Sequence, residues 1–280
     1  MSDLQITSID DLLRLVDDWS RRFKFQGEIG YPAIWYRGQS RLDWKLRPGI
    51  LRDDFIELAK KIYPSAPIEI AVLILEATLN RRFRSMGASL LPSGCALVDV
   101  YFLAQHHGFR TRLLDWTSNP LAALYFAVES ERNKNRDGAL YVIHPGKLIL
   151  GEHRKSNLLL PPLTPHDSYL RERIERLFDL QHGDDMSEDP FIIPVLPDQR
   201  AGRLYQQGSC FTYHGFGTRH LDDSVGEWWL EKYIIPQTSK AYLLRTLRRL
   251  NVTRATLFHD LDSVSAEIIG AYGLSAGAAE

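Results

Sequence analysis

Apolar positions recur at helical spacing in several parts of the chain, and this periodicity predicts most of its helices. The first predicted helix covers about residues 8–23, with Ser8 as its N-cap and acidic residues in its first turn. Further helices are predicted over about 67–84, 95–104, 121–128, 168–180 and 237–250. Thr253 is the expected cap of a last helix, whose inward-facing residues would be Leu257, Leu261, Val264 and Ile268.

Short runs of β-branched and aromatic residues between turn residues predict the strands. They cover about residues 33–36, 139–143, 191–196, 209–213 and 233–235. The first of these runs ends at Arg37 and Gly38, so a strand end would carry an arginine. Helices and short strands mixed in this order predict a helix-rich α+β fold. The segment 147–197 is the least informative, and no linker divides the chain.

The segment from Gln105 to Val128 contains more chemically specialised residues than any other part of the sequence. Gly108 is expected to end the helix before it, and Asn119 with Pro120 to begin the helix after it. That second helix is apolar on nearly every face and should be buried. The short connection between the two core helices would present a group of polar and aromatic side chains, namely Arg110, Arg112, Asp115, Trp116, Thr117 and Ser118.

Composition excludes few functions but sets useful limits. The 280 residues are 44% hydrophobic, and the formal net charge is -1. There is therefore no global electrostatic argument for binding nucleic acid or an anionic membrane. The N-terminus lacks the basic start and apolar run of a signal peptide, and no apolar stretch approaches the length of a bilayer span. Cys95 and Cys210 are expected to be reduced core residues, as in a cytoplasmic protein.

Several common catalytic motifs are absent from the sequence. It has no HExxH, no paired CxxC and no calcium-loop pattern, so no metal is expected. His106 and His107 are adjacent and would point in different directions on a helix, so they cannot chelate one ion together. A glycine-rich phosphate loop and a GxSxG nucleophile elbow are also missing.

The remaining candidates combine arginines at element ends with a carboxylate, a hydroxyl and aromatic neighbours. They are Arg37, Arg110, Arg112, Asp115, Thr117 and the pair Gln206 and Gln207. A guanidinium matches phosphate oxygens in pairs, and tryptophan or tyrosine can stack on a base. The structural alternative is a buried ion pair of Asp115 with Arg112 or Arg37. A basic loop with Arg41, Trp44, Lys45 and Arg47 would either face an anionic planar ligand or be solvated.

Three motifs together resemble a known family. They are Tyr36-Arg37-Gly38-Gln39, the run Gln105-His106-x-Gly108-x-x-Thr111-Arg112-Leu113-Leu114-Asp115-Trp116-Thr117, and Gln206-Gln207-Gly208-x-x-Phe211. The C-terminal run from Ala255 to Asp262 adds to the match. The chain resembles the FRG domain from about residue 33 to 268. This resemblance implies one domain over 1–280, with its core at about 33–268 and the N-terminal helix 8–23 packed on it. Tyr36 stands where the family name has phenylalanine.

A more distant resemblance implies a chemistry. The strand ending in Arg37, the hydroxyl-bearing segment leading into an alanine-rich helix and the strand soon after are similar to ADP-ribosyltransferases of the Arg-Ser-Glu type. This resemblance implies a small, mostly antiparallel split sheet and NAD as the cofactor. The catalytic positions would be Arg37, Asp115, Thr117 and Gln207, and the cofactor-binding positions Arg37, Gly38, Gln39, Arg112, Trp116 and Gln206. Because glutamine does not titrate, Asp115 would supply the carboxylate that supports the ribose cation.

The resulting hypothesis is an ADP-ribosyltransferase-like enzyme, or a nucleotide-binding protein, that acts on a nucleic-acid or protein acceptor. One alternative is a non-catalytic module that recognises nucleic acid or a partner protein through Arg37, Arg41, Trp44 and Arg47. Another is a nuclease or hydrolase that uses Asp115 with His106. The first hypothesis predicts that Arg37, Asp115, Thr117 and Gln207 line one cleft.

Overall fold

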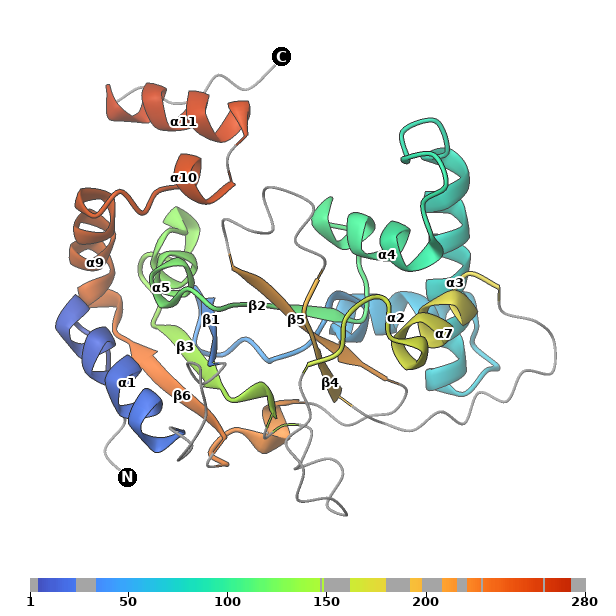
Figure 1. Cartoon of the computed structure of the whole chain (residues 1–280), viewed down its shortest axis with the longest axis horizontal. Helices are drawn as coiled ribbons and strands as arrows, with labels where there is room; N and C mark the ends of the chain where they lie inside the picture. The colour runs from blue at the N-terminus through green and yellow to red at the C-terminus, as the bar shows by residue number, and fades with distance from the viewer. Residues whose placement is uncertain are drawn as a thin grey trace.

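The computed structural model contains one six-stranded sheet with helices packed against it (Figure 1). It describes residues 5–23, 34–146, 148, 162–179, 192–197, 208–215, 221–227, 229–258 and 260–272. In sheet order the strands are β4 (Ile192–Val195), β5 (Ser209–His214), β2 (Leu113–Thr117), β1 (Trp35–Gln39), β3 (Gly138–Ile143) and β6 (Leu230–Ile235). Every neighbouring pair of these strands is antiparallel. The predicted α+β fold with a largely antiparallel sheet is confirmed.

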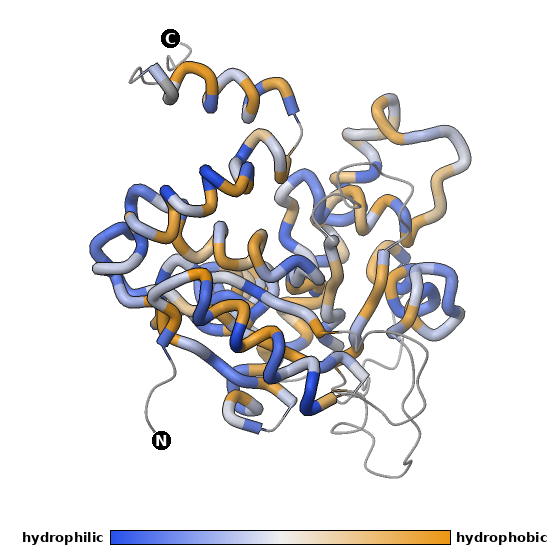
Figure 2. The backbone as a smooth tube through the Cα atoms, turned by 60° about the vertical axis from the view of Figure 1, so that its left-hand side comes forward, coloured by the Kyte–Doolittle hydropathy of each residue, from blue (hydrophilic) through white to orange (hydrophobic). Residues whose placement is uncertain are grey.

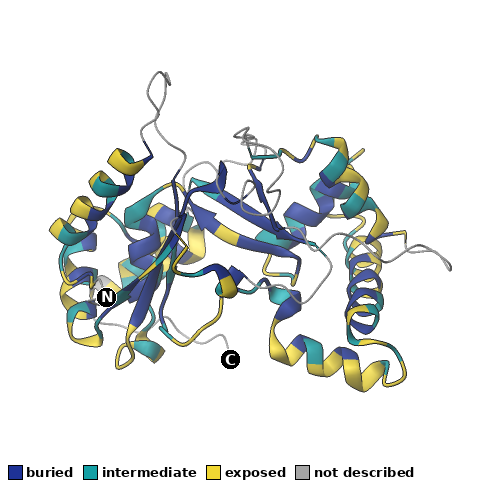
Figure 3. Cartoon of the chain, turned by 90° about the horizontal axis from the view of Figure 1, so that it is seen from below, coloured by how far each residue is buried: buried dark blue, intermediate teal, exposed yellow. Residues whose placement is uncertain are grey.

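The described helices lie before, between and after the strands along the chain. The described α-helices are α1 (Ile9–Arg22), α2 (Asp53–Ile62), α3 (Ile68–Met86), α4 (Leu97–His106), α5 (Pro120–Val128), α7 (Ser168–Arg176), α9 (Gln237–Arg249), α10 (Arg254–Phe258) and α11 (Leu261–Ala271). Short 3-10 turns are η1 (Gly49–Leu51), η2 (Glu131–Asn133) and η3 (Leu221–Ser224). Figure 3 shows the strands buried in the middle of the molecule and exposed residues along the outer sides of the helices.

The sheet is nearly divided between β1 and β2. These two strands share one register pair, Tyr36 with Thr117. By contrast, β1 pairs with β3 over five residues, and β2 pairs with β5 over five residues. The sheet therefore consists of two well-paired halves, β4-β5-β2 and β1-β3-β6, which join at Tyr36 and separate beyond it.

Two helical layers cover the two halves. Helices α1, α5 and α9 bury the β1-β3-β6 half, where residues such as Tyr36, Leu140 and Ile235 form a common core with them. Helices α3, α4 and α7 bury the other half around Phe211 and Tyr213. Asp115 pairs with Phe211, and Thr117 pairs with both Tyr36 and Ser209. Because side chains alternate along a strand, these paired residues share one face of the sheet. That face, between α4 on one side and α5 on the other, is where a site can form.

The predicted helix boundaries hold well at the caps. Ser8 and Asp11 form a capping box at the start of α1, and the Asn119 side chain accepts hydrogen bonds from the first turn of α5. Gly108 has φ +75°, which permits the turn after α4, and Asn251 has φ 60° after α9. These side-chain signals act locally, so the sequence predicts them reliably.

Two predictions about elements are wrong. Residues 113–117, expected within a connection, form the central strand β2, whose burial on both faces removes the polar–apolar alternation that marks a strand. The last helix is two helices, because Asp260 caps a new one by accepting from the Ser263 N–H. Leu261 and Ile268 on α11 are 84% and 58% exposed rather than inward-facing. Figure 2 shows hydrophobic residues along this C-terminal helix, at the periphery of the fold.

Some predictions concern residues outside the described part of the chain. These include Gln206, Gln207 and the C-terminal tail 273–280. In the described part, none of the helices combines the length and apolarity that crossing a bilayer demands.

Candidate functional site

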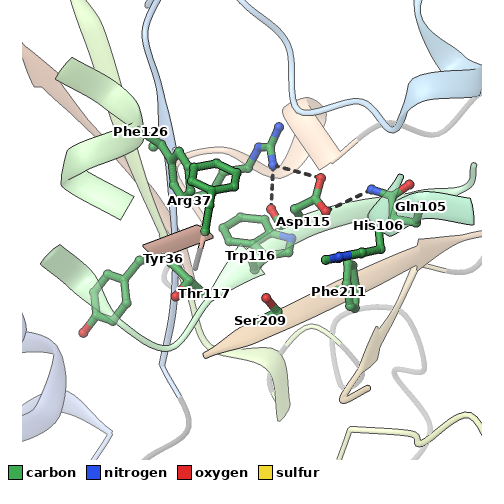
Figure 4. A pocket seen from close by; sticks show the side chains of 12 residues that line it. Tyr36, Arg37, Gln105, His106, Asp115, Trp116, Thr117, Phe126, Ser209 and Phe211 are labelled. Atoms are coloured by element: carbon green, nitrogen blue, oxygen red, sulfur yellow. Dashed lines mark hydrogen bonds and ion pairs between the residues drawn. The ribbon is translucent and has the colours of Figure 1, made fainter. Parts of the chain in front are cut away.

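A pocket of about 330 Å³ lies where β1 and β2 separate (Figure 4). Its floor comes from β2 and β5, one wall from the end of α4, and the opposite wall from α5 and α10. The residues that line it are Tyr36, Arg37, Gly38, Gln105, His106, Asp115, Trp116, Thr117, Phe126, Ser209, Phe211 and Phe258. Five of the residues predicted for the site therefore lie together: Arg37, Gly38, Asp115, Trp116 and Thr117.

Arg37 spans the gap between the separating strands. Its Nη1 donates a hydrogen bond of 2.6 Å to the main-chain carbonyl of Asp115, and the same atom lies 3.9 Å from Asp115 Oδ2. The Arg37 side chain is 15% exposed, whereas that of Asp115 is 60% exposed. Burial lowers the pKa of Arg37, and the carboxylate of Asp115 opposes this effect. Arg37 Nε is a buried donor with no hydrogen-bond acceptor in the described part of the chain. The guanidinium thus keeps donor capacity beside the pocket.

A chain of hydrogen bonds fixes the carboxylate of Asp115. Thr111 Oγ1 donates to Gln105 Oε1 at 2.5 Å, and Gln105 Nε2 donates to Asp115 Oδ1 at 2.9 Å. The threonine contact orients the amide, because only its oxygen can accept from a hydroxyl while its nitrogen donates to a carboxylate. Gln105 belongs to the last turn of α4, which ends before Gly108. The helix end therefore holds Asp115 from the side opposite Arg37, as Figure 4 shows.

Aromatic side chains form much of the pocket wall, and each is held by a partner. The Trp116 indole N–H donates to Thr212 Oγ1 at 3.1 Å. The ring of Phe126 on α5 packs edge-on against Phe258 of α10, with ring centroids 5.8 Å apart. Phe211 packs against Phe102 of α4 in the same manner. Rings fixed in this way can stack on a planar ligand with little loss of side-chain freedom.

Gly38 and Thr117 connect the pocket to the first turn of α5. A Cβ at Gly38 would lie 1.8 Å from the carbonyl oxygen of Ala123, so only glycine lets α5 approach β1 this closely. Thr117 Oγ1 accepts from the Asn119 N–H at 3.0 Å, just before α5 begins. Both residues line the pocket, and both also have a clear structural role.

The other candidate residues lie elsewhere. Arg112 is buried in an ion pair with Glu76, at 2.6 Å between Nη2 and Oε2. Gln39 is buried on β1, and its side-chain amide donates to the carbonyl of Lys45. Arg110 pairs with Asp54 at the surface. None of the three lines the pocket.

Sequence reasoning missed several pocket residues. Gln105 was within a motif but had no assigned role in the site, and His106 had a role only in the alternative of a nuclease or hydrolase. Ser209, Phe211, Phe126 and Phe258 had no assigned role either. Apolar rings on helices and strands look like ordinary core residues in a sequence, and only the separation of β1 from β2 exposes them to a pocket. Gln105 had a weak signal, because it is a polar residue at the end of an apolar helix.

The described residues contain no group of three or more His, Cys, Asp or Glu side chains arranged to hold a metal ion. Both cysteines are free thiols: Cys210, on β5, is buried, and Cys95 is half-buried. Burial raises the pKa of Cys210 to about 12, so this thiol has little nucleophilic character.

Comparison with known proteins gives one match. Residues 32–136 match the family model of the FRG domain. This chain contains an FRG domain. No match was found among curated proteins or among solved structures. The FRG domain supplies β1, β2 and α5, and with them Arg37, Gln105 and Asp115. Ser209, Phe211 and Phe258 come from the chain that follows it, so the pocket is built from the FRG domain and the segments beyond it.

Proposed function

We propose that this pocket binds a nucleotide, with NAD as the first candidate, and that it cleaves the bond between nicotinamide and ribose. ADP-ribose would then be transferred to a nucleic-acid or protein acceptor. One observation carries the proposal: Arg37 and Asp115 meet in an aromatic-walled pocket at the point where the sheet divides. The resemblance of Arg37 and Thr117 to positions of Arg-Ser-Glu transferases agrees with it.

The recognition of the nucleotide would rest on Arg37 and the aromatic rings. A guanidinium binds phosphate oxygens through two parallel N–H groups, and Arg37 has a buried Nε without an acceptor in the described part of the chain. Trp116, Phe126 and Phe211 offer faces or edges to a base or a nicotinamide ring. A volume of about 330 Å³ is near the lower end for small-molecule sites, which suits one half of a dinucleotide.

Asp115 would stabilise the reacting ribose. When the glycosidic C–N bond breaks, both bonding electrons leave with nicotinamide and positive charge develops on the ribose. A carboxylate that accepts a hydrogen bond from Gln105 and lies 3.9 Å from the Arg37 guanidinium needs little reorganisation to stabilise that charge. Thr117 would sit at the hydroxyl position, although its oxygen also accepts from the Asn119 N–H.

The alternative of a recognition module has less support from the charges near the pocket. Arg41 pairs with Asp43, and Arg47 lies near both Asp53 and Asp222. These carboxylates offset the positive charge that a nucleic-acid surface would need. Binding to nucleic acid with strong salt dependence, and without NAD affinity, would favour the module instead.

The test is nicotinamide release from NAD by the purified protein, with and without cell lysate as a source of acceptors. Arg37→Ala should weaken NAD binding in calorimetry, and Asp115→Asn should leave binding while lowering release by about a hundredfold or more. Arg21→Ala and Asp17→Asn are matched controls, since these residues form an exposed ion pair on α1 and do not line the pocket. Wild-type protein that neither binds NAD nor releases nicotinamide would contradict the proposal.

A further inference from the structure

His106 is a pocket residue with no role in the proposal so far. It is the last residue of α4, and the positive φ of Gly108 turns the chain immediately afterwards. Figure 4 shows its imidazole beside Phe211, on the side of the pocket from which Gln105 reaches Asp115. His107, the next residue, is exposed and does not line the pocket. The end of α4 therefore presents one of two adjacent histidines to the site.

Transfer of ADP-ribose requires a group that removes a proton from the acceptor. Water, a hydroxyl or an amine loses a proton when it attacks the ribose carbon, and that proton must reach a base. In the proposed function Asp115 stabilises the ribose cation, and its carboxylate contacts Gln105 and Arg37. Arginine does not release its proton in proteins, and burial raises the pKa of Tyr36 to about 12. Among the described lining residues, His106 is left as the proton acceptor.

We propose that His106 is the general base that activates the acceptor, a role that rests on the proposed function. The glycosidic C–N bond breaks and its electron pair leaves with nicotinamide. The acceptor then forms a bond to the ribose carbon, and its proton passes to an imidazole nitrogen of His106 and on to solvent. With water as acceptor, the products are ADP-ribose, nicotinamide and one proton.

Among the described residues that line the pocket with His106, two are charged. Arg37 comes from β1 and Asp115 from β2, while α5 and α10 contribute the uncharged Phe126 and Phe258. On its own helix the ring of His107 packs against that of His106, with centroids 5.3 Å apart. An imidazole is the side chain whose ordinary pKa suits proton exchange near neutral pH, which is the chemistry that the acceptor requires.

The experiment compares His106→Ala with His107→Ala in nicotinamide release and in transfer to acceptors from lysate, from roughly pH 5 to 9. His106→Ala should lower the rate at neutral pH by about a hundredfold and remove the acid limb of the pH profile. Added imidazole should restore part of the rate. NAD affinity in calorimetry should stay within about threefold of wild type. His107→Ala should keep the wild-type rate and profile.

The outcomes separate this inference from the proposed function. Wild-type protein without NAD binding or nicotinamide release would overturn both. Active wild type, with a His106→Ala variant that keeps the rate and the acid limb, would overturn the role of His106 alone. A His106→Ala variant that loses NAD binding and gains nothing from imidazole would likewise overturn it, because the histidine would then act in binding or folding. His106→Asn, which keeps a polar side chain, should match His106→Ala in rate if proton transfer is its role.

Discussion

Two arginine–carboxylate pairs, Arg112–Glu76 and Arg37–Asp115, lie at the beginning and the middle of the same strand segment, residues 112–117, but in opposite environments. Arg112 and Glu76 are 2% and 1% exposed, and both Nε and Nη2 of the arginine contact Oε2. Arg37 and Asp115 are 3.9 Å apart, and the carboxylate is 60% exposed. The first pair is a closed contact inside the protein. The second is a loose contact at the edge of a pocket.

The surroundings of the closed pair explain its tightness. The Tyr101 hydroxyl donates to Glu76 Oε1 at 3.0 Å, and the hydroxyl oxygen accepts from the main-chain N–H of Arg112. Burial by itself lowers the pKa of Arg112, but the attraction of Glu76 more than offsets it, so the pKa is raised. This network joins α3, α4 and the start of β2. It fixes the strand that carries Asp115, three residues further along.

The comparison also explains why residue type alone does not identify a binding arginine. Arg37 lies within β1 and Arg112 directly precedes β2. Both lie near aromatic residues, which is why both were candidates for the nucleotide site. The two arginines differ in whether a carboxylate from another element occupies the hydrogen-bond donors of the guanidinium, as Glu76 does for Arg112. That partner, Glu76, lies on α3, far away in the sequence.

The largest expected effect concerns the closed pair. Glu76→Ala should reduce the free energy of unfolding by about 3–5 kcal/mol, because it leaves a buried guanidinium without its carboxylate. Replacing both partners, as in Glu76→Leu with Arg112→Met, should recover a substantial part of that loss. The measurement is urea denaturation followed by circular dichroism.

The exposed pair on α1 provides the control for this prediction. Arg21 and Asp17 are 70% and 66% exposed, so Asp17→Ala should change the free energy of unfolding by less than about 1 kcal/mol. If Glu76→Ala has an effect as small as Asp17→Ala, the description of Arg112 and Glu76 as a closed structural pair is wrong.

A smaller effect on stability tests how well β1, the strand that carries Arg37, is packed. The pair of Arg37 with Asp115 is called the open pair below. Tyr36 precedes Arg37 and is 3% exposed, and burial raises its pKa from 10.0 to about 12. Because the pKa of Tyr36 is higher in the folded state, its contribution to the free energy of unfolding is fully present below pH 10. That contribution is lost as the pH rises towards 12. Between these two pH values, Tyr36 should lower the free energy of unfolding by up to about 1.4 kcal/mol per pH unit.

The measurement is the free energy of unfolding in urea at several values of alkaline pH. Tyr36→Phe should reduce the slope by the contribution of one proton. Tyr242→Phe, at an exposed position on α9, is the matched control and should keep the wild-type slope. An unchanged slope for Tyr36→Phe would mean that the β1 edge of the pocket is open to solvent in solution.

The elements and their caps were predictable because their signals are local. Ser8 caps α1, Asn119 caps α5 and Gly108 permits the turn after α4, each through contacts within a few residues. The strand β2 was not predicted, because burial on both faces gives it no alternation. The division of α10 from α11 was also missed, since apolar spacing does not say whether another element is present to cover it.

The candidate site was predictable only in part for a related reason. Arg37 and Asp115 could be found because both lie in short motifs that resemble the FRG domain, residues 36–39 and 105–117. The roles of Gln105, Phe211 and Phe258 depend on how α4, β5 and α10 meet at the gap between β1 and β2. That gap follows from a single register pair, and no short sequence pattern encodes it.

The smallest expected effect on stability is that of Asp115→Asn. This substitution best distinguishes the pair of Arg37 with Asp115 from the pair of Arg112 with Glu76. Asp115→Asn keeps an oxygen that can accept from Gln105 Nε2, and it leaves the main-chain carbonyl bound to Arg37. The free energy of unfolding should therefore change by less than about 1 kcal/mol, as for other exposed ion pairs. If Asp115 serves a reaction, this variant is folded, binds the nucleotide and does not release nicotinamide. A loss of several kcal/mol would instead make Asp115 a structural partner of Arg37, and the open pair would then resemble the closed one in function despite its geometry.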